Sequence, residues 1–180
     1  METFTGIRAF VDHPDYRTHR QAALNSLDME TIDAPIVPII EGMATLPYCF
    51  TLQSCYGHFL YGDQREPRNV ERLPALIHVS DIEYRLAYIA LCVENSRSGV
   101  TFLRDLGGIP RIDPEYVQFG CAEWFWERQV NSYVLQVEPA RSATKDRINV
   151  GYGEALHLQK VRDAFWNELC LLVQHRLAIR

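Results

Sequence analysis

Apolar residues recur at three- and four-residue intervals in several stretches of this chain, which is the spacing of one face of an α-helix. The longest stripe predicts a helix over residues 155–176, and its members are Leu158, Val161, Phe165, Leu169 and Leu172. Two earlier stretches predict helices over 14–27 and 36–46. A shorter one predicts a helix over 101–106 that ends at the glycine pair Gly107-Gly108.

A further helix is predicted over residues 81–95. Its apolar positions are Ile82, Leu86, Ile89 and Val93, again three or four residues apart. The segment from Ser80 to Glu83 matches a capping box, in which the serine accepts a hydrogen bond from the first turn and the glutamate reaches back.

Alternating or β-branched patterns predict strands over 48–54, 73–79, 116–124 and 132–137. In the first of these, Phe50 and Leu52 share one side, while Thr51 and Gln53 share the other. The last two strands are predicted to pair, and the polar stretches 62–72 and 140–153 are predicted to be loops. The order of elements predicts one α+β domain over residues 1–180, with a mainly antiparallel or mixed sheet covered by helices.

Composition narrows the class of protein. The chain has 180 residues, 47% of them hydrophobic and 23% charged, which is ordinary for a globular domain. No apolar run approaches the roughly 20 residues that span a bilayer, and no secretory signal is recognisable, so we expect no membrane partner. The five scattered cysteines favour reduced thiols and a cytoplasmic location. A net charge of −5 favours a small-molecule ligand over broad nucleic-acid binding.

The candidate site is the segment from Thr51 to His58, at the end of the first predicted strand. It brings hydroxyl, amide, thiol, phenol and imidazole groups together, and Gly57 allows a turn or a close approach to a ligand. His78, near the end of the next predicted strand, is expected to face the same opening. We therefore expect one pocket bordered by Ser54, Cys55, Gly57, His58 and His78.

Three kinds of chemistry fit this segment, beside a plain polar turn. Cys55 can act as a nucleophile if His58 or His78 serves as its base. The pair Cys55 and His58 can ligate a metal together with His78, Cys49 or Cys121, although a single tight pair is a weak zinc signal. The segment can also be a loop that binds a polar cofactor or substrate through its backbone and hydroxyl groups.

The same residues resemble the Thr-x-Ser-Ser-Cys-Ser-Gly-Arg motif of the wybutosine-synthesising tRNA methyltransferase family. Thr51, Ser54, Cys55 and Gly57 match this motif, whereas Gln53, Tyr56 and His58 stand where the family has serine, serine and arginine. Later segments of the chain resemble segments of the family in the same order, so the resemblance extends over most of residues 20–175. These segments are 76–79 with His78, 96–100 with Ser98, 133–139, and the final helix with Leu158 and Asn167.

The resemblance implies an α+β fold, S-adenosylmethionine as the methyl donor, and a modified tRNA base or related small acceptor as substrate. On this hypothesis Thr51, Ser54, Cys55, Gly57 and Ser98 bind the cofactor, His58 and His78 are catalytic, and no metal is expected. Two alternatives stay open: a non-enzymatic metabolite-binding or assembly module of the same fold, and a Cys/His hydrolase.

Two further clusters have a functional and a structural interpretation. The run Trp124-Phe125-Trp126 can stack a base or adenine ring, or it can belong to the core or to a contact between subunits. Arg65, Arg68 and Arg72 can bind phosphate, or they can lie in a solvated loop.

Overall fold

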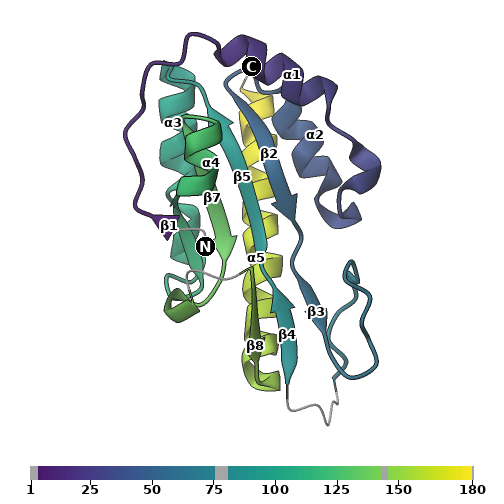
Figure 1. The fold of residues 1–180 in the computed structure, drawn as a ribbon. Coiled ribbons are helices and arrows are strands. Elements are labelled where there is room, and N and C mark those ends of the chain that lie inside the picture. Colours follow the sequence, from purple (N-terminus) through teal and green to yellow (C-terminus); the bar gives the residue numbers. More distant parts are fainter. Residues whose placement is uncertain (1–3, 76–80, 143–145, 180) are drawn as a thin grey trace.

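The computed structural model describes residues 4–75, 81–142 and 146–179. Its α-helices are α1 (Tyr16–Asn25), α2 (Val37–Thr45), α3 (Arg97–Leu106), α4 (Glu123–Arg128) and α5 (Tyr152–Ala178) (Figure 1). Its strands are β1 (Phe4–Thr5), β2 (Cys49–Cys55), β3 (His58–Leu60), β4 (Ile82–Arg85), β5 (Ala87–Val93), β6 (Val117–Ala122), β7 (Ser132–Val137) and β8 (Arg147–Val150). Short 3₁₀ turns are η1 (Met29–Thr31), η2 (Ala34–Ile36), η3 (Ile109–Ile112) and η4 (Ala140–Ser142).

The strands form two sheets. The larger has the order β1-β6-β7-β5-β2, and the smaller has the order β3-β4-β8. All strand pairs within the described residues are antiparallel. The chain therefore has the α+β fold that the order of elements predicts. The two sheets follow one another in space because β2 leads into β3 and β4 leads into β5 (Figure 1).

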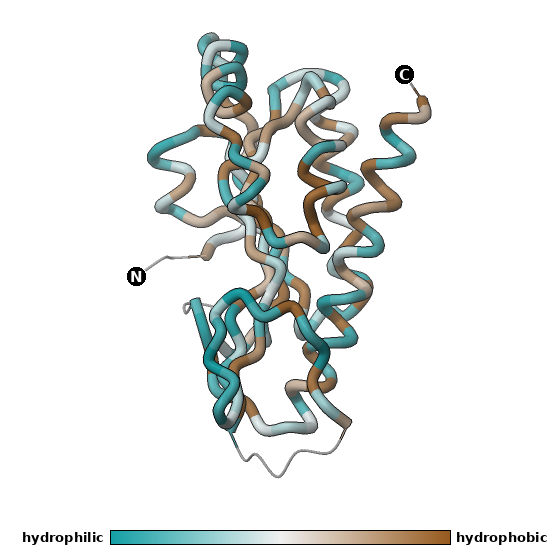
Figure 2. Tube along the Cα trace, turned by 90° about the vertical axis from the view of Figure 1, so that its right-hand side faces the viewer, coloured by the Kyte–Doolittle hydropathy of each residue, from teal (hydrophilic) through white to brown (hydrophobic). Residues whose placement is uncertain are grey.

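One face of the larger sheet, here called the covered face, packs against α2, α3 and α5. Alternate residues of β5 and β7 point into this core, and Ile89, Leu91 and Leu135 are fully buried there. Helix α5 contacts α2, β7 and β4, so it lies against both sheets. Figure 2 shows it as one continuous helix along the length of the molecule. The predicted helix 155–176 is confirmed, and its apolar stripe is what holds it against the sheets.

The opposite face, here called the open face, is only partly covered. At one end α1 packs on it, with Tyr16 against Phe50 and Cys92. Beside it α4 places Phe125 against Ala90 and Val134. The rest of this face carries the polar or partly exposed side chains of β2, β5 and β7, and it forms the cleft described below.

The predicted helix 81–95 is wrong, because this segment forms β4 and β5. Strand β5 lies between β7 and β2 in its sheet, and almost all of its residues are buried. A strand buried on both faces is a continuous apolar run, and in such a run apolar residues also occur at helical spacing. The 3–4 spacing of Leu86, Ile89 and Val93 is therefore a consequence of burial on two sides.

Three smaller predictions also need correction. The predicted strand 73–79 has no strand at residues 73–75, and 76–79 lie outside the described residues. The predicted loop 140–153 contains β8 and the start of α5. The predicted strand 116–124 ends at Ala122, because Glu123 and Trp124 begin α4, although the last two predicted strands pair as predicted. Among the described residues, no helix is both long and apolar enough to cross a bilayer.

A bulge in β2 changes which side chains share a face. Thr51 pairs with Leu91, yet Gln53 pairs with the next residue along, Ala90, so Leu52 is the extra residue. Directly paired residues lie on the same face of a sheet. Thr51 is thus on the covered face and Gln53 on the open face, which corrects the simple alternation predicted for this strand.

Candidate functional site

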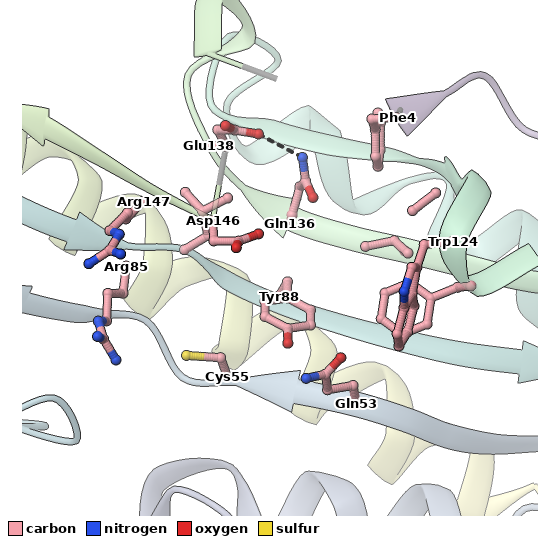
Figure 3. A pocket seen from close by; sticks show the side chains of 14 residues that line it. Phe4, Gln53, Cys55, Arg85, Tyr88, Trp124, Gln136, Glu138, Asp146 and Arg147 are labelled. Carbon is pink, nitrogen blue, oxygen red and sulfur yellow. Dashed lines mark hydrogen bonds between the residues drawn. The ribbon is translucent and has the colours of Figure 1, made fainter. Parts of the chain in front are cut away.

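A cleft of about 480 Å³ lies over the open face, close to the point where the two sheets meet. A volume between roughly 300 and 1,000 Å³ is typical of a site for one small molecule. Strands β2, β5 and β7 form its floor, α4 and Phe4 form one end, and the ends of β4 and β8 form the other (Figure 3).

The end of the cleft at β4 and β8 is strongly charged. Arg85 and Arg147 are directly opposite one another across this strand pair, and both lie within 3.7 Å of one Glu83 carboxylate oxygen. Asp146 and the buried Glu138 line the cleft beside them (Figure 3). Glu83 supplies one carboxylate to the arginine pair, and each guanidinium has further N–H donors whose planar geometry suits a carboxylate or phosphate ligand.

The other end of the cleft is aromatic. Trp124, Phe125 and Phe4 line it, and Tyr88 stands on the floor between the aromatic and charged ends (Figure 3). The Trp124 side chain is 42% exposed, and the Arg128 guanidinium lies 3.8 Å from the centre of its ring. Polar groups on the floor come from Gln53 and from Gln136, which donates a 2.8 Å hydrogen bond to Glu138.

The segment that follows β2 is held rigidly by its neighbours. Gly57 has a positive φ of 95°, and a Cβ there would lie 2.7 Å from that of Ala87, so this turn requires glycine. The buried Arg162 of α5 donates a 2.8 Å hydrogen bond to the Gly57 carbonyl oxygen. Trp166, also from α5, donates one of the same length to the Tyr56 carbonyl oxygen.

His58 is buried directly beneath this turn and both of its ring nitrogens are engaged. Its Nδ1 lies 2.9 Å from the Asn69 carbonyl oxygen, and its Nε2 lies 3.1 Å from Oδ2 of Asp33. The same Asp33 oxygen accepts a 2.8 Å hydrogen bond from the Tyr56 N–H. Because a carbonyl oxygen only accepts, Nδ1 must donate, and the Asp33 carboxylate favours a second proton on Nε2.

The pKa values of the pair agree with this arrangement. Burial alone would lower the pKa of His58, but hydrogen bonds to Asp33, Cys55 and the Asn69 carbonyl outweigh it and raise the pKa to about 10. Burial alone would raise the pKa of Asp33, yet the hydrogen bonds from His58 and from the Tyr56 N–H hold it below its usual range. In the absence of other ligands the pair is an imidazolium and a carboxylate.

The residues proposed from the sequence do not border one pocket. Cys55 lines the cleft on the open face. Thr51 and Ser54 pair with residues of the covered face and line a separate groove of about 330 Å³ between α1, α2 and the edge of β2. Gln53 lines both spaces.

Ser98, another proposed residue, lies far from Cys55 in the sheet. Ser98 is exposed in the first turn of α3, which follows the C-terminal end of β5. Cys55 pairs with Tyr88, near the N-terminal end of that strand. His78 lies outside the described residues, so the structure gives it no place.

The cleft also contains residues that the sequence did not single out. Arg85, Tyr88 and Gln136 come from strands, and the mistaken helix over 81–95 hid two of them. Gln136, a lone polar residue inside an apolar strand, was a signal that this face was not fully covered. Asp33 carried no such signal, because it lies 25 residues before His58 in the chain.

No family model and no curated protein matches this chain. Among solved structures, the PH1069 protein from Pyrococcus horikoshii is similar, with 12% identity over 92% of this chain and 96% of that chain, and a TM-score of 0.53. A structure of the PH1069 protein from Pyrococcus horikoshii OT3 has 10% identity over 92% and 94% of the two chains and a TM-score of 0.47. A hypothetical protein from Aeropyrum pernix has 11% identity over 79% and 96%, with a TM-score of 0.38. The first of these likenesses shows a shared fold.

Proposed function

We propose that this protein is an S-adenosylmethionine-dependent methyltransferase that binds its cofactor in the cleft on the open face. The observation that carries the proposal is the division of this cleft into an aromatic end and a charged end, with Tyr88 between them. The resemblance of Thr51, Ser54, Cys55 and Gly57 to the wybutosine-synthesising methyltransferase motif supports the choice of cofactor, and of these four residues Cys55 lines the cleft.

The groups in the cleft complement those of the cofactor. An adenine ring suits the aromatic end at Trp124 and Phe125, because flat rings stack on aromatic side chains. A carboxylate suits the paired guanidinium groups of Arg85 and Arg147. The Glu138 carboxylate lies beside that pair and suits a cationic ammonium or sulfonium group.

When bound, S-adenosylmethionine supplies an activated methyl group whose bond to sulfur breaks as a bond to the acceptor forms, leaving S-adenosylhomocysteine and a proton. The protein then needs to bind, orient and exclude water more than to activate a group. The acceptor that we propose is a modified tRNA base or a related small ring. Asp146 is the exposed carboxylate in the cleft that is available to take the proton.

This proposal changes the role expected for His58. A general base needs a nitrogen lone pair, and both nitrogens of His58 face hydrogen-bond acceptors. We therefore assign His58 to positioning the turn at Gly57, and the same observation argues against the Cys/His hydrolase alternative. His78 stays a candidate catalytic residue.

The cytoplasm is the location that we propose, because all five cysteines are described and none forms a disulfide.

Calorimetric titration of S-adenosylmethionine into the protein tests the cofactor. We expect one binding site per chain, and we expect Arg147→Ala to weaken binding about ten- to a hundredfold, since a hydrogen bond to a charged group contributes roughly 1.5–3 kcal/mol. Arg104→Ala is the matched control, because it removes an exposed arginine from α3. No binding heat and no thermal stabilisation by the cofactor would overturn the proposal.

Transfer is tested separately. Incubation with methyl-labelled cofactor and unfractionated tRNA should move the label to RNA. Binding without any transfer to RNA or to small acceptors would instead favour the non-enzymatic metabolite-binding module.

A further inference from the structure

We infer that Asp33, Cys55 and His58 form a binding site for one zinc ion, beside the cleft. This inference does not rest on the proposed methyltransferase activity. The three residues come from two segments, the 3₁₀ turn region before α2 and the junction of β2 with β3. One ligand atom from each, a carboxylate oxygen, a thiol sulfur and an imidazole nitrogen, lies within 4.8 Å of the other two.

The spacing of the His58 and Asp33 ligand atoms suits a tetrahedral ion, and the Cys55 sulfur lies within 4.8 Å of both. Zinc bonds of about 2.0–2.3 Å at tetrahedral angles place ligand atoms roughly 3.3–3.6 Å apart. Nε2 of His58 and Oδ2 of Asp33 are 3.1 Å apart, so they need to separate by only a few tenths of an ångström. The donor set of one nitrogen, one sulfur and one oxygen is among those that zinc accepts, and the two anionic ligands offset its charge.

The groups around the ligands are those that orient metal ligands. A histidine that ligates a metal commonly donates its other ring N–H to a carbonyl or carboxylate, which fixes the tautomer and the ring. His58 directs Nε2 into the cluster and holds Nδ1 2.9 Å from the Asn69 carbonyl oxygen. Asp33 is oriented in turn by the Tyr56 N–H. The backbone contact of His58 is thus made by Nδ1, and Nε2 faces the side chain of Asp33.

The backbone between Cys55 and His58 is rigid, so the ligands are preorganised. Gly57 is fixed by its positive φ against Ala87, and Arg162 holds its carbonyl oxygen. Cys55 also lines the cleft, which gives an ion a route to the cluster from solvent. Three protein ligands leave one tetrahedral position, the arrangement typical of a zinc site that accepts a water or ligand atom.

The sequence alone had left a metal as an alternative, with His78, Cys49 or Cys121 as the third ligand. His78 lies outside the described residues. Cys49 and Cys121 are both buried in the main core, and the cluster includes neither. Asp33 completes the set instead. His58 is also the motif position at which the resembled family has arginine, a side chain that does not ligate zinc. The site is thus a feature of this chain's own residues.

Zinc binding by untagged protein, stripped with a chelator and free of S-adenosylmethionine, tests the inference. We expect one zinc per chain by elemental analysis after dialysis, and competition with a chromophoric chelator gives the affinity. Cobalt(II) reports the ligands, because a bound thiolate gives a sulfur-to-cobalt charge-transfer band. Cys55→Ser should abolish this band and weaken zinc binding about a hundredfold or more.

Two further variants keep the test independent of folding. Asp33→Asn retains an oxygen that accepts from the Tyr56 N–H, and it should weaken zinc binding with the cobalt charge-transfer band retained at saturation. His157→Gln is the matched control, because His157 forms an Asp–His pair with Asp113 at 2.8 Å that lies outside the cluster. It should bind zinc as the unchanged protein does. No charge-transfer band, or equal zinc affinity in Cys55→Ser, would overturn the site, whether or not S-adenosylmethionine binds.

Discussion

The two faces of the five-stranded sheet are made by the same strands, and they differ in what covers them. On the covered face, α2, α3 and α5 bury Ile89, Leu91 and Leu135 completely. On the open face, their neighbours Tyr88 and Gln136 stay partly exposed and line the cleft. Alternation along a strand determines the face of the sheet on which each side chain lies. The helices that pack on the sheet, here α2, α3 and α5, determine which of the two faces is buried in the core. We therefore expect covered-face changes to act on stability and open-face changes to act on binding.

The largest effect on stability should come from the covered face. Phe165→Ala removes a fully buried ring of α5 and should lower the free energy of unfolding by about 3–5 kcal/mol. Leu171→Ala, on an exposed position of the same helix, should change it by less than about 0.5 kcal/mol. Urea unfolding followed by circular dichroism measures both. Equal losses would mean that α5 is not what stabilises this face.

The junction between the two sheets should be the next most sensitive position. Gly57→Ala forces a side chain into a positive φ and against Ala87, which should cost about 2 kcal/mol or more. Gly153→Ala, where a Cβ meets nothing within 4 Å, should cost nothing measurable. Thermal unfolding of the two variants gives the comparison, and a Gly57 variant as stable as its control would contradict the backbone conformation described for the turn.

The ion pair beneath that turn should make the metal-free protein sensitive to alkaline pH. The pKa of His58 is raised to about 10, above its value of 6.5 in the unfolded chain, so its contribution to stability is complete below about pH 6.5. It is then lost as the pH rises through the folded pKa, by at most about 1.4 kcal/mol per pH unit. Asp33→Asn should flatten this decline. Unfolding midpoints measured with chelator from pH 6 to pH 10 will show it, and a decline equally steep in that variant would assign the effect to another group.

The smallest effect on stability should come from the open face. Arg147 is exposed, and removing it ends an exposed ion pair with Glu83 while it also removes a like charge opposite Arg85. Arg147→Ala should thus leave the free energy of unfolding within about 0.5 kcal/mol of its original value, while it weakens cofactor binding. Parallel urea unfolding and calorimetry separate the two quantities. A large loss of stability would mean that the charged end of the cleft is structural.

The sequence predicted some elements of secondary structure correctly and others wrongly. Residues 155–176 repeat their apolar positions over many turns, and the helix is present because only a helix buries such a stripe on one side. Residues 87–93 are buried on both sides, and there the same spacing gave the wrong element. The candidate segment was found at the correct strand end, yet alternation along the strand places Ser54 and Cys55 on opposite faces. The bulge at Leu52 also places Thr51 and Gln53 on opposite faces, and no residue type in β2 signals a bulge.

The sequence by itself determined the fold class, the C-terminal helix, the pairing of β6 with β7, and the presence of polar chemistry near Cys55. These features depend on residues close together in the chain, whose periodicity and type are visible directly. Only the tertiary structure decided that Asp33 meets His58, that Arg85 faces Arg147, and that the open face is left uncovered. Each of these depends on how distant segments pack, and packing is set by the whole core rather than by any local pattern.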